Sequence, residues 1–216
     1  MIDPQLYLIS PPKIDDLSAF AEALNEAFAA GAGTDAGIAC VQLRLKDVPD
    51  AEILRAAEAL LPICQEGGAG FLINDRADLA KKSGADGVHL GQTDGTVAEA
   101  RALLGADKDI GVTCHGSLHL AMEAGEAGAD YVAFGAFFPS TTKQVIHRAE
   151  PDLLTRWNAM ATVPCVAIGG ITAATSQSLS DAGADYLAVS GAVWNHPEGA
   201  GAGVKAFAEA LKSGAS

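Results

Sequence analysis

Ser83-Gly84-Ala85-Asp86-Gly87 is the first of three related stretches in this chain. The others are Ala127-Gly128-Ala129-Asp130-Tyr131 and Ala182-Gly183-Ala184-Asp185-Tyr186. Each follows an alanine-rich segment with helical spacing and precedes a short apolar run. Glycine is the preferred residue where a helix stops in the left-handed conformation, so each stretch predicts a turn from a helix into a strand. We therefore interpret the three aspartates as structural residues at the start of a strand, and not as catalytic groups.

The apolar runs extend this pattern over the whole chain. Most are continuous and not alternating, which is typical of strands that are covered on both faces in a parallel sheet. They predict strands at 6–10, 38–45, 70–74, 87–90, 110–114, 131–137, 163–168 and 186–190.

The segments between these runs have helical spacing of their apolar residues. They predict helices at 17–30, 51–65, 97–104, 118–127, 151–159, 174–182 and 204–212, with loops at 33–37 and 199–203. Repeated strand–helix units predict a single (β/α)8 TIM barrel, one domain over residues 1–216. An open doubly wound sheet would want a glycine-rich turn after its first strand, and Pro11-Pro12-Lys13 stands there instead.

Composition excludes several classes of protein. The net charge of −13 argues against nucleic-acid binding, which needs a basic surface. Because no run of 18 apolar residues occurs, we expect no membrane span. The N-terminus lacks a basic region followed by a long apolar stretch, so we expect no signal peptide and a cytoplasmic protein. The four cysteines form no C-x-x-C pair and fit small buried residues better than ligands or disulfides.

The active site of such a barrel lies at the C-terminal ends of its strands. Gln42, Arg44 and Lys46 alternate along the second predicted strand and would therefore project to one side. Arginine and lysine together suit a phosphate group, although a solvated strand end is the plainer interpretation. We favour an anion site because the intervening residues, Val41, Leu43 and Leu45, are all apolar.

Asn74-Asp75 and Asp94 follow the third and fourth predicted strands, which would be neighbours. Two carboxylates with retained waters are what Mg²⁺ prefers, especially where substrate phosphates complete its shell. Each aspartate could instead be a helix N-cap. No cluster of His and Cys suggests zinc.

Three further segments predict phosphate contacts. Ser140-Thr141-Thr142-Lys143 follows the sixth strand, Gly169-Gly170 the seventh and Val189-Ser190 the eighth. Hydroxyls and backbone amides in such loops can hold phosphate, and Lys143 can neutralise a leaving group. A metal-linked site and an amide-linked site in one pocket suggest two phosphorylated substrates. His115, after Thr113, could act as an acid or base or only as a supporting hydrogen-bond partner, whereas we interpret His89 as structural.

In combination, these segments resemble the thiamine phosphate synthase family, whose barrel is shared by the thiazole tautomerases. The resembling stretches are 41–46, 73–76, 85–92 with Asp94, 135–143 and 167–171. The resemblance implies that hydroxymethylpyrimidine pyrophosphate is joined to thiazole phosphate, releasing pyrophosphate. In the family, departure of pyrophosphate is thought to leave a pyrimidine carbocation, which the thiazole nitrogen captures.

The resemblance also implies roles for individual residues. Lys143, Arg44 and Thr113 would be catalytic, and Asp75 and Asp94 would bind Mg²⁺. The substrate-binding residues would be Gln42, Arg44, Lys46, Asn74, Thr113, Ser140, Thr141, Thr142, Lys143, Gly170, Val189 and Ser190. The family usually has serine at Thr113 and threonine at Ser140, and segment 144–148 does not match with it.

Two alternatives remain open. A thiazole tautomerase would use a histidine near Thr113, a role that His115 could fill, but it has no need of Asp75, Asp94 and Lys143. A barrel that binds thiamine precursors without turnover would show no Mg²⁺ dependence. The expected partners are the two small-molecule substrates, with no nucleic acid and no membrane, and a homo-oligomer stays open.

Overall fold

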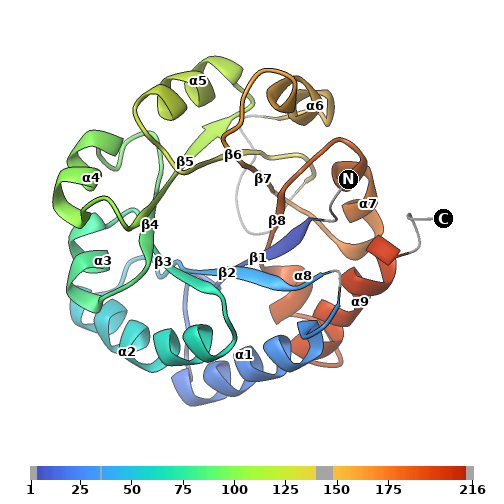
Figure 1. The fold of residues 1–216 in the computed structure, drawn as a ribbon. Coiled ribbons are helices and arrows are strands. Elements are labelled where there is room, and N and C mark those ends of the chain that lie inside the picture. The colour runs from blue at the N-terminus through green and yellow to red at the C-terminus, as the bar shows by residue number, and fades with distance from the viewer. Residues whose placement is uncertain (1–3, 35, 140–147, 213–216) are drawn as a thin grey trace.

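The chain folds into a closed barrel of parallel strands surrounded by helices, as the computed structural model shows (Figure 1). The structure describes residues 4–34, 36–139 and 148–212. Strands pair in chain order from β1 to β8, and β8 pairs with β1 to close the ring. Figure 1 shows the barrel viewed along its axis, with β1 beside β8. The predicted (β/α)8 barrel is confirmed.

The strands lie close to their predicted positions. They are β1 (Gln5–Ile9), β2 (Ile38–Leu43), β3 (Gly70–Asn74), β4 (Gly87–Leu90), β5 (Asp109–His115), β6 (Tyr131–Gly135), β7 (Cys165–Ile168) and β8 (Tyr186–Val189). β7 begins at Cys165 and not at 163, because Pro164 has no N–H to contribute to a ladder. β2 ends at Leu43, two residues early, since the next backbone amide, that of Arg44, donates to the Ser10 side chain.

The helices follow the expected alternation with two additions. They are α1 (Leu17–Gly31), α2 (Asp50–Glu66), α3 (Ala77–Ser83), α4 (Val97–Leu104), α5 (Leu118–Glu126), α6 (Asp152–Asn158), α7 (Ala173–Asp181), α8 (Gly191–Trp194) and α9 (Ala200–Lys212). The short helices α3 and α8 were not among the predicted ranges. The loop predicted at 33–37 is confirmed for its described residues.

The loop predicted at 199–203 is wrong, because α9 begins at Ala200. Its glycines permit close packing and do not break the helix. A Cβ on Gly203 would lie 2.8 Å from the Cα of Val193, and one on Gly201 would lie 3.1 Å from the carbonyl oxygen of Glu26. Glycine therefore lets α9 approach the backbones of α8 and α1, and this packing outweighs the poor helix propensity of glycine.

Buried residues form two layers, one on each side of the strand ring. The larger layer lies between strands and helices and includes Val41, Leu43 and Leu45, the apolar face predicted for the second strand. The smaller layer fills the inside of the barrel. Its fully or nearly buried members are Tyr7, Ile9, Leu72, Tyr131, Ala133, Val166 and Ala188. Polar groups among them matter for the site described below.

The three Gly-Ala-Asp stretches fasten the N-terminal end of the barrel. Their glycines have positive φ, 75° at Gly84, 89° at Gly128 and 95° at Gly183. Each aspartate accepts a hydrogen bond from the backbone amide of the first or second residue of the preceding strand. The pairs are Asp86 with Phe71 (2.9 Å), Asp130 with Ile110 (2.7 Å) and Asp185 with Cys165 (2.7 Å). These contacts support their interpretation as structural residues.

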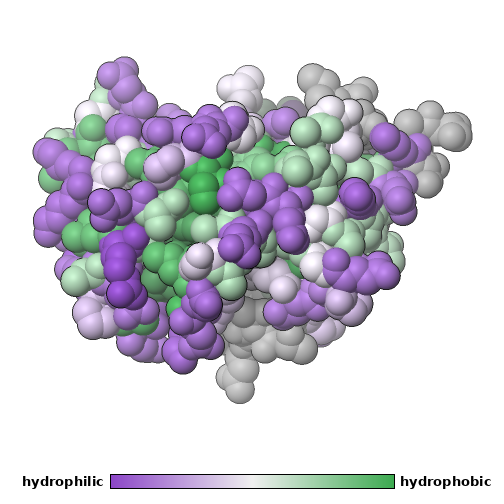
Figure 2. Space-filling view, turned by 90° about the horizontal axis from the view of Figure 1, so that it is seen from below, coloured by the Kyte–Doolittle hydropathy of each residue, from purple (hydrophilic) through white to green (hydrophobic). Residues whose placement is uncertain are grey.

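The outer surface is largely hydrophilic, with apolar patches between the charged side chains on the face in Figure 2. Within the described part of the chain, no helix is long and apolar enough to cross a membrane. All four cysteines are free thiols. Cys64, Cys114 and Cys165 are buried, as predicted, whereas Cys40 is only partly buried.

Candidate active site

The predicted site residues that the structure describes gather at the C-terminal ends of the strands. Arg44 and Lys46 follow β2, Asn74 and Asp75 stand at the end of β3, and Asp94 follows β4. Ser140, Thr141, Thr142 and Lys143 lie outside the described residues. The contacts below therefore concern the half of the barrel mouth formed after β2 to β5 and the turns after β7 and β8.

The end of β2 is held by the loop after β1. The Ser10 hydroxyl accepts from the backbone amide of Arg44 at 2.8 Å, and the amide of Lys46 donates to the Pro12 carbonyl at 2.9 Å. Burial lowers the pKa of Arg44, and the nearby Asp75 carboxylate opposes that shift. A guanidinium that has already lost part of its water can bind an anion at little further cost of desolvation.

Gln42 lies deeper than the two cations. Only 2% of it is exposed, and its amide nitrogen donates to the Tyr7 hydroxyl inside the barrel at 2.8 Å. The residue therefore belongs to the floor of the mouth and not to its rim.

Asp75 has a strained backbone, with φ of 64°. Left-handed conformations are uncommon outside glycine and concentrate at functional sites. Its amide donates to the His89 carbonyl at 2.7 Å, and its carboxylate is paired with the Lys46 ammonium. Asp75 is not the N-cap of α3, because that position belongs to Arg76. The capping alternative for Asp75 is wrong.

Asp94 is not a helix cap either. α4 is capped by Thr96, which forms a capping box with Glu99. The Asp94 carboxylate accepts from the amide of Gly91 at 3.1 Å. Partial burial raises the pKa of Asp94, and the adjacent Asp75 carboxylate raises it further. Two carboxylates are thus held against each other at the mouth.

This pair fits a divalent cation. A dication between Asp75 and Asp94 would remove their repulsion, which adds to burial in raising the pKa of Asp94. Among the described residues, no group of three or more His, Cys, Asp or Glu side chains could hold a metal. The protein would therefore supply two carboxylates and leave other positions to water and substrate phosphate, which is the usual arrangement for Mg²⁺.

Thr113 and His115 stand at the end of β5. The Thr113 hydroxyl is 2.8 Å from His89 Nε2, and its carbonyl accepts from the Gln92 side chain at 2.5 Å. The pairing of β5 with β6 shifts between Thr113 and His115. His115 has φ of 52°, a left-handed conformation like those of Asp75 and Asp47.

The turn after β7 requires its glycines. Gly169 and Gly170 have φ of 105° and 64°, and a Cβ on Gly170 would lie 2.2 Å from the Pro139 carbonyl oxygen. The backbone after β6 therefore packs directly on this turn. After β8, Val189 is buried, and Ser190 is the N-cap of the short helix α8. Extra helices at this place commonly contribute to phosphate sites in such barrels.

Sequence reasoning assigned no role to some residues that support the site. Ser10 was given no contact, and Tyr7 and Tyr131 were not singled out. Their polar atoms lie inside the barrel, where they contact Gln42 and His89. A tyrosine inside an otherwise apolar predicted strand, Tyr7 in β1 and Tyr131 in β6, is the signal that could have found them, but their pairing depends on the register between strands.

A family model described as thiamine monophosphate synthase matches residues 6–193 of the chain. The chain belongs to this family. A thiamine-phosphate synthase of Rhodospirillum centenum is 57% identical over 98% of this chain and 100% of its own length. One of Hyphomonas neptunium is 51% identical over 94% of this chain and 91% of its own. A thiamine phosphate pyrophosphorylase of Pyrococcus furiosus has the same fold, with a TM-score of 0.80, 28% identity, and coverage of 98% and 97% of the two chains. The resemblance seen in the sequence is confirmed.

Proposed function

We propose that the chain is a thiamine-phosphate synthase, a transferase. It joins hydroxymethylpyrimidine pyrophosphate to thiazole phosphate and releases pyrophosphate. Family membership and identities of up to 57% over nearly the full chain support this function. The observation that carries it is the mouth itself, where Arg44 and Lys46 lie beside the Asp75–Asp94 pair. Cations and carboxylates side by side suit a pyrophosphate bound with a metal ion.

The pyrophosphate would bind at the ends of β2 and β3. Arg44 offers several donors to phosphate oxygens, and Lys46 can turn from Asp75 toward the ligand when a cation takes the carboxylates. Asn74 can add an amide contact. Mg²⁺, held by Asp75 and Asp94, would supply charge neutralisation for the bound pyrophosphate. This role for Mg²⁺ is part of the proposal.

The chemistry asks little more of the protein. Departure of pyrophosphate needs stabilisation of the developing negative charge, and the acceptor needs to be held in line. Arg44 and Lys46 serve the first need, and Lys143 stays a prediction for the same role. The thiazole phosphate would be held by backbone amides of Gly170, Val189 and Ser190, together with Ser140, Thr141 and Thr142.

The tautomerase alternative rests on His115 at the end of β5. An isomerase that moves a proton needs an acid or base, but it has no use for a carboxylate pair next to two cations. Identity of 57% to a thiamine-phosphate synthase over nearly the full chain argues against a barrel that only binds precursors. We therefore place the synthase first.

The test is a direct assay. Purified protein is mixed with both substrates, with and without Mg²⁺, and thiamine phosphate is detected after oxidation to its fluorescent thiochrome. Product that depends on Mg²⁺ is the expected result. Folded protein that gives no product would refute the proposed function, and an assay for thiazole isomerisation would then follow.

The cytoplasm is the compartment that we propose. The four free cysteines agree with a reducing environment, in which thiols persist. Fractionation of the native cells with detection of the protein in each fraction checks this proposal. Recovery in a secreted fraction would contradict it.

Assembly into a homo-oligomer stays a prediction, and light scattering of the purified protein checks it. A molar mass at a multiple of 21.9 kDa would establish the oligomer. A mass equal to that of one chain would rule it out at the concentration used.

A further inference from the structure

A chain of hydrogen bonds crosses the inside of the barrel below the site. It begins at Gln42, whose amide nitrogen donates to the Tyr7 hydroxyl at 2.8 Å. The Tyr7 and Tyr131 hydroxyls are 2.9 Å apart, and Tyr131 is 2.9 Å from His89 Nδ1. His89 Nε2 is 2.8 Å from the Thr113 hydroxyl. These hydrogen bonds thus join two residues predicted to bind substrate, Gln42 and Thr113.

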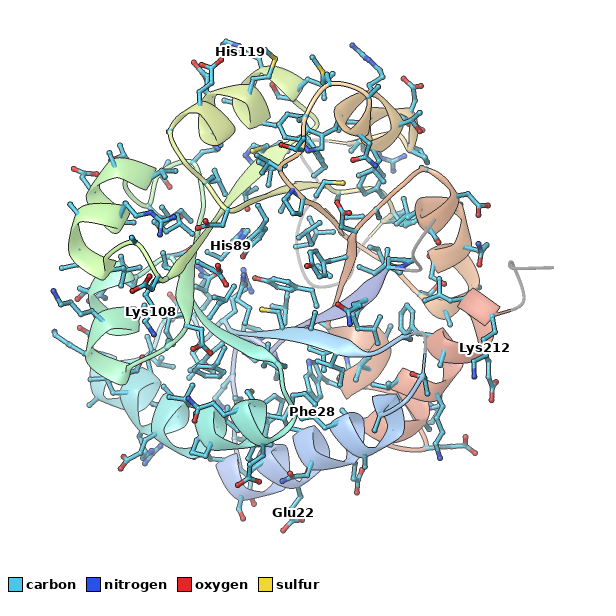
Figure 3. All side chains as sticks on the ribbon, viewed as in Figure 1. Glu22, Phe28, His89, Lys108, His119 and Lys212 are labelled. Carbon is cyan, nitrogen blue, oxygen red and sulfur yellow. The ribbon has the colours of Figure 1, made fainter. Side chains whose placement is uncertain are left out.

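The barrel is built to bring these rings together. His89, Gly111 and Tyr131 lie side by side on β4, β5 and β6. Because Gly111 has no side chain, the rings of His89 and Tyr131 stack across it, with centroids 5.6 Å apart and planes inclined by 26°. A Cβ on Gly111 would lie 1.8 Å from Cζ of Tyr131. Figure 3 shows His89 inside the ring of strands.

The number of protons on each group limits which group donates and which accepts along these hydrogen bonds. The Gln42 amide nitrogen can only donate, so the Tyr7 oxygen accepts from it. Burial raises the pKa of both tyrosines well above the ordinary value, so each keeps one proton to donate. Continuing from Gln42, the hydrogen bonds run in one direction when Tyr7 donates to Tyr131 and Tyr131 donates to His89 Nδ1, whereas the reverse order would leave the Tyr7 proton to the nearby Cys40 sulfur. With Nδ1 accepting, the Nε2–H of His89 donates to Thr113.

We propose that Tyr7, Tyr131 and His89 are positioning residues that orient the Thr113 hydroxyl as a hydrogen-bond donor toward the ligand. Its oxygen accepts from His89, so its own proton is left to point elsewhere. At the C-terminal end of β5 the open side is the mouth of the barrel. Thr113 therefore recognises an acceptor atom, such as a ring nitrogen of the aromatic substrate. The identity of that ligand rests on the proposed function. The direction of the hydrogen bonds from Gln42 to Thr113 does not.

The Gln42 end has a matching consequence. Its amide nitrogen is committed to Tyr7, so Gln42 presents its oxygen, an acceptor, to a ligand at the floor of the mouth. The chain thus fixes one donor and one acceptor in a single pattern. A ligand with an acceptor near Thr113 and an amino group near Gln42 is bound, and the reversed pattern is rejected.

The first test reads the tautomer of His89 in the ligand-free protein. Nitrogen-15 NMR of imidazole-labelled protein separates protonated from unprotonated ring nitrogens, and the His89→Gln variant assigns the signals. We expect a neutral ring with the proton on Nε2. A ring with the proton on Nδ1 would mean that the chain runs the other way, and it would overturn the proposal. This measurement needs no turnover, so it stands even if the proposed function fails.

The second test compares variants by kcat and KM. Tyr131→Phe keeps the ring and removes the link, so we expect kcat/KM for the pyrophosphate substrate to fall about tenfold. Tyr186→Phe is the control, since it removes a partly buried hydroxyl at the start of β8, outside this set of hydrogen bonds. Equal kcat/KM for both variants would overturn the proposal. Tyr7→Phe gives a second reading if Tyr131→Phe does not fold.

Rescue at position 89 sharpens the result. Gln can place an amide nitrogen near the position of His89 Nε2, whereas Asn reaches only the position of Nδ1. If donation to Thr113 is what matters, His89→Gln retains more kcat than His89→Asn. The opposite ranking would overturn the assigned role. Wild-type protein without activity would instead count against the proposed function.

Discussion

The two ends of the barrel both carry aspartates, but they use them in opposite ways. At the N-terminal end, Asp86, Asp130 and Asp185 each accept a backbone amide at 2.7 to 2.9 Å. At the C-terminal end, Asp75 and Asp94 lie close together, and burial together with the Asp75 charge raises the pKa of Asp94. One set stabilises the fold, and the other maintains an unfavourable arrangement that a ligand can relieve.

The cations follow the same division. At the N-terminal end, the Arg101 guanidinium binds the Asp130 carboxylate and several carbonyls, and the ammonium of Lys108 is 4.0 Å from Asp86. At the mouth, Arg44 is partly desolvated and Lys46 is paired with Asp75. Changes at the mouth should therefore alter catalysis, and changes at the other end should alter stability.

The largest effect is expected for Asp75→Asn. The change removes a carboxylate proposed to hold Mg²⁺, and kcat should fall by roughly a hundredfold or more. The amide keeps the size of the side chain, and the lost repulsion with Asp94 offsets the lost ion pair with Lys46, so the melting temperature should change little. Steady-state kinetics over a range of Mg²⁺ concentrations, with thermal unfolding of the same samples, measures both. Unchanged turnover would remove Asp75 from the metal site.

Asp185→Ala tests the opposite end. It leaves the buried amide of Cys165 without its acceptor, and the free energy of unfolding should drop by about 1–3 kcal/mol. Since the site is at the far end of the strands, kcat and KM should stay close to wild type at temperatures where the variant is folded. Urea unfolding and the thiochrome assay check the two statements. A loss of turnover in folded protein would break the division between the ends.

A smaller effect is expected for Lys46→Met, with Lys108→Met as its matched control. Loss of the Lys46 charge weakens pyrophosphate binding, so KM for that substrate should rise about tenfold. The control removes a lysine that faces Asp86 at the other end, and its kinetics should match wild type. Initial rates across substrate concentrations decide this, and equal KM values for the two variants would exclude Lys46 from the pyrophosphate site.

The sequence predicted the N-terminal end of the barrel better than its interior. Gly128 and Asp130 predict a turn from local sequence alone, because a left-handed glycine ends the helix within a few residues of the aspartate. Local propensity misled at Gly201 and Gly203, where the contact that rewards glycine comes from α1 and α8. Such a contact depends on the packing of distant segments.

The candidate site was predictable where residues stand at strand ends. Arg44, Asp75 and Asp94 could be grouped from strand order alone, because parallel strands end at the same rim. Tyr7 and Tyr131 could not, since their hydroxyls are 124 residues apart in the chain and meet only through the register of the closed barrel. The same register places His89, which we had interpreted as structural, within 2.8 Å of the Thr113 hydroxyl.

The smallest predicted effect concerns Asp94→Asn and pH. The folded wild type has a raised Asp94 pKa, so ionised Asp94 lowers stability above that pKa, and the cost disappears as falling pH protonates it. The variant lacks this cost. It should be more stable at neutral pH by no more than about 0.5 kcal/mol, because water screens a partly exposed pair. The gain should vanish as the pH falls to about 3.9, the ordinary value for aspartate.

Mg²⁺ should stabilise wild type more than the variant in thermal unfolding. A variant that is less stable than wild type at neutral pH would show that Asp94 holds the fold, as the aspartates at the other end do, and the contrast between the two ends would fail.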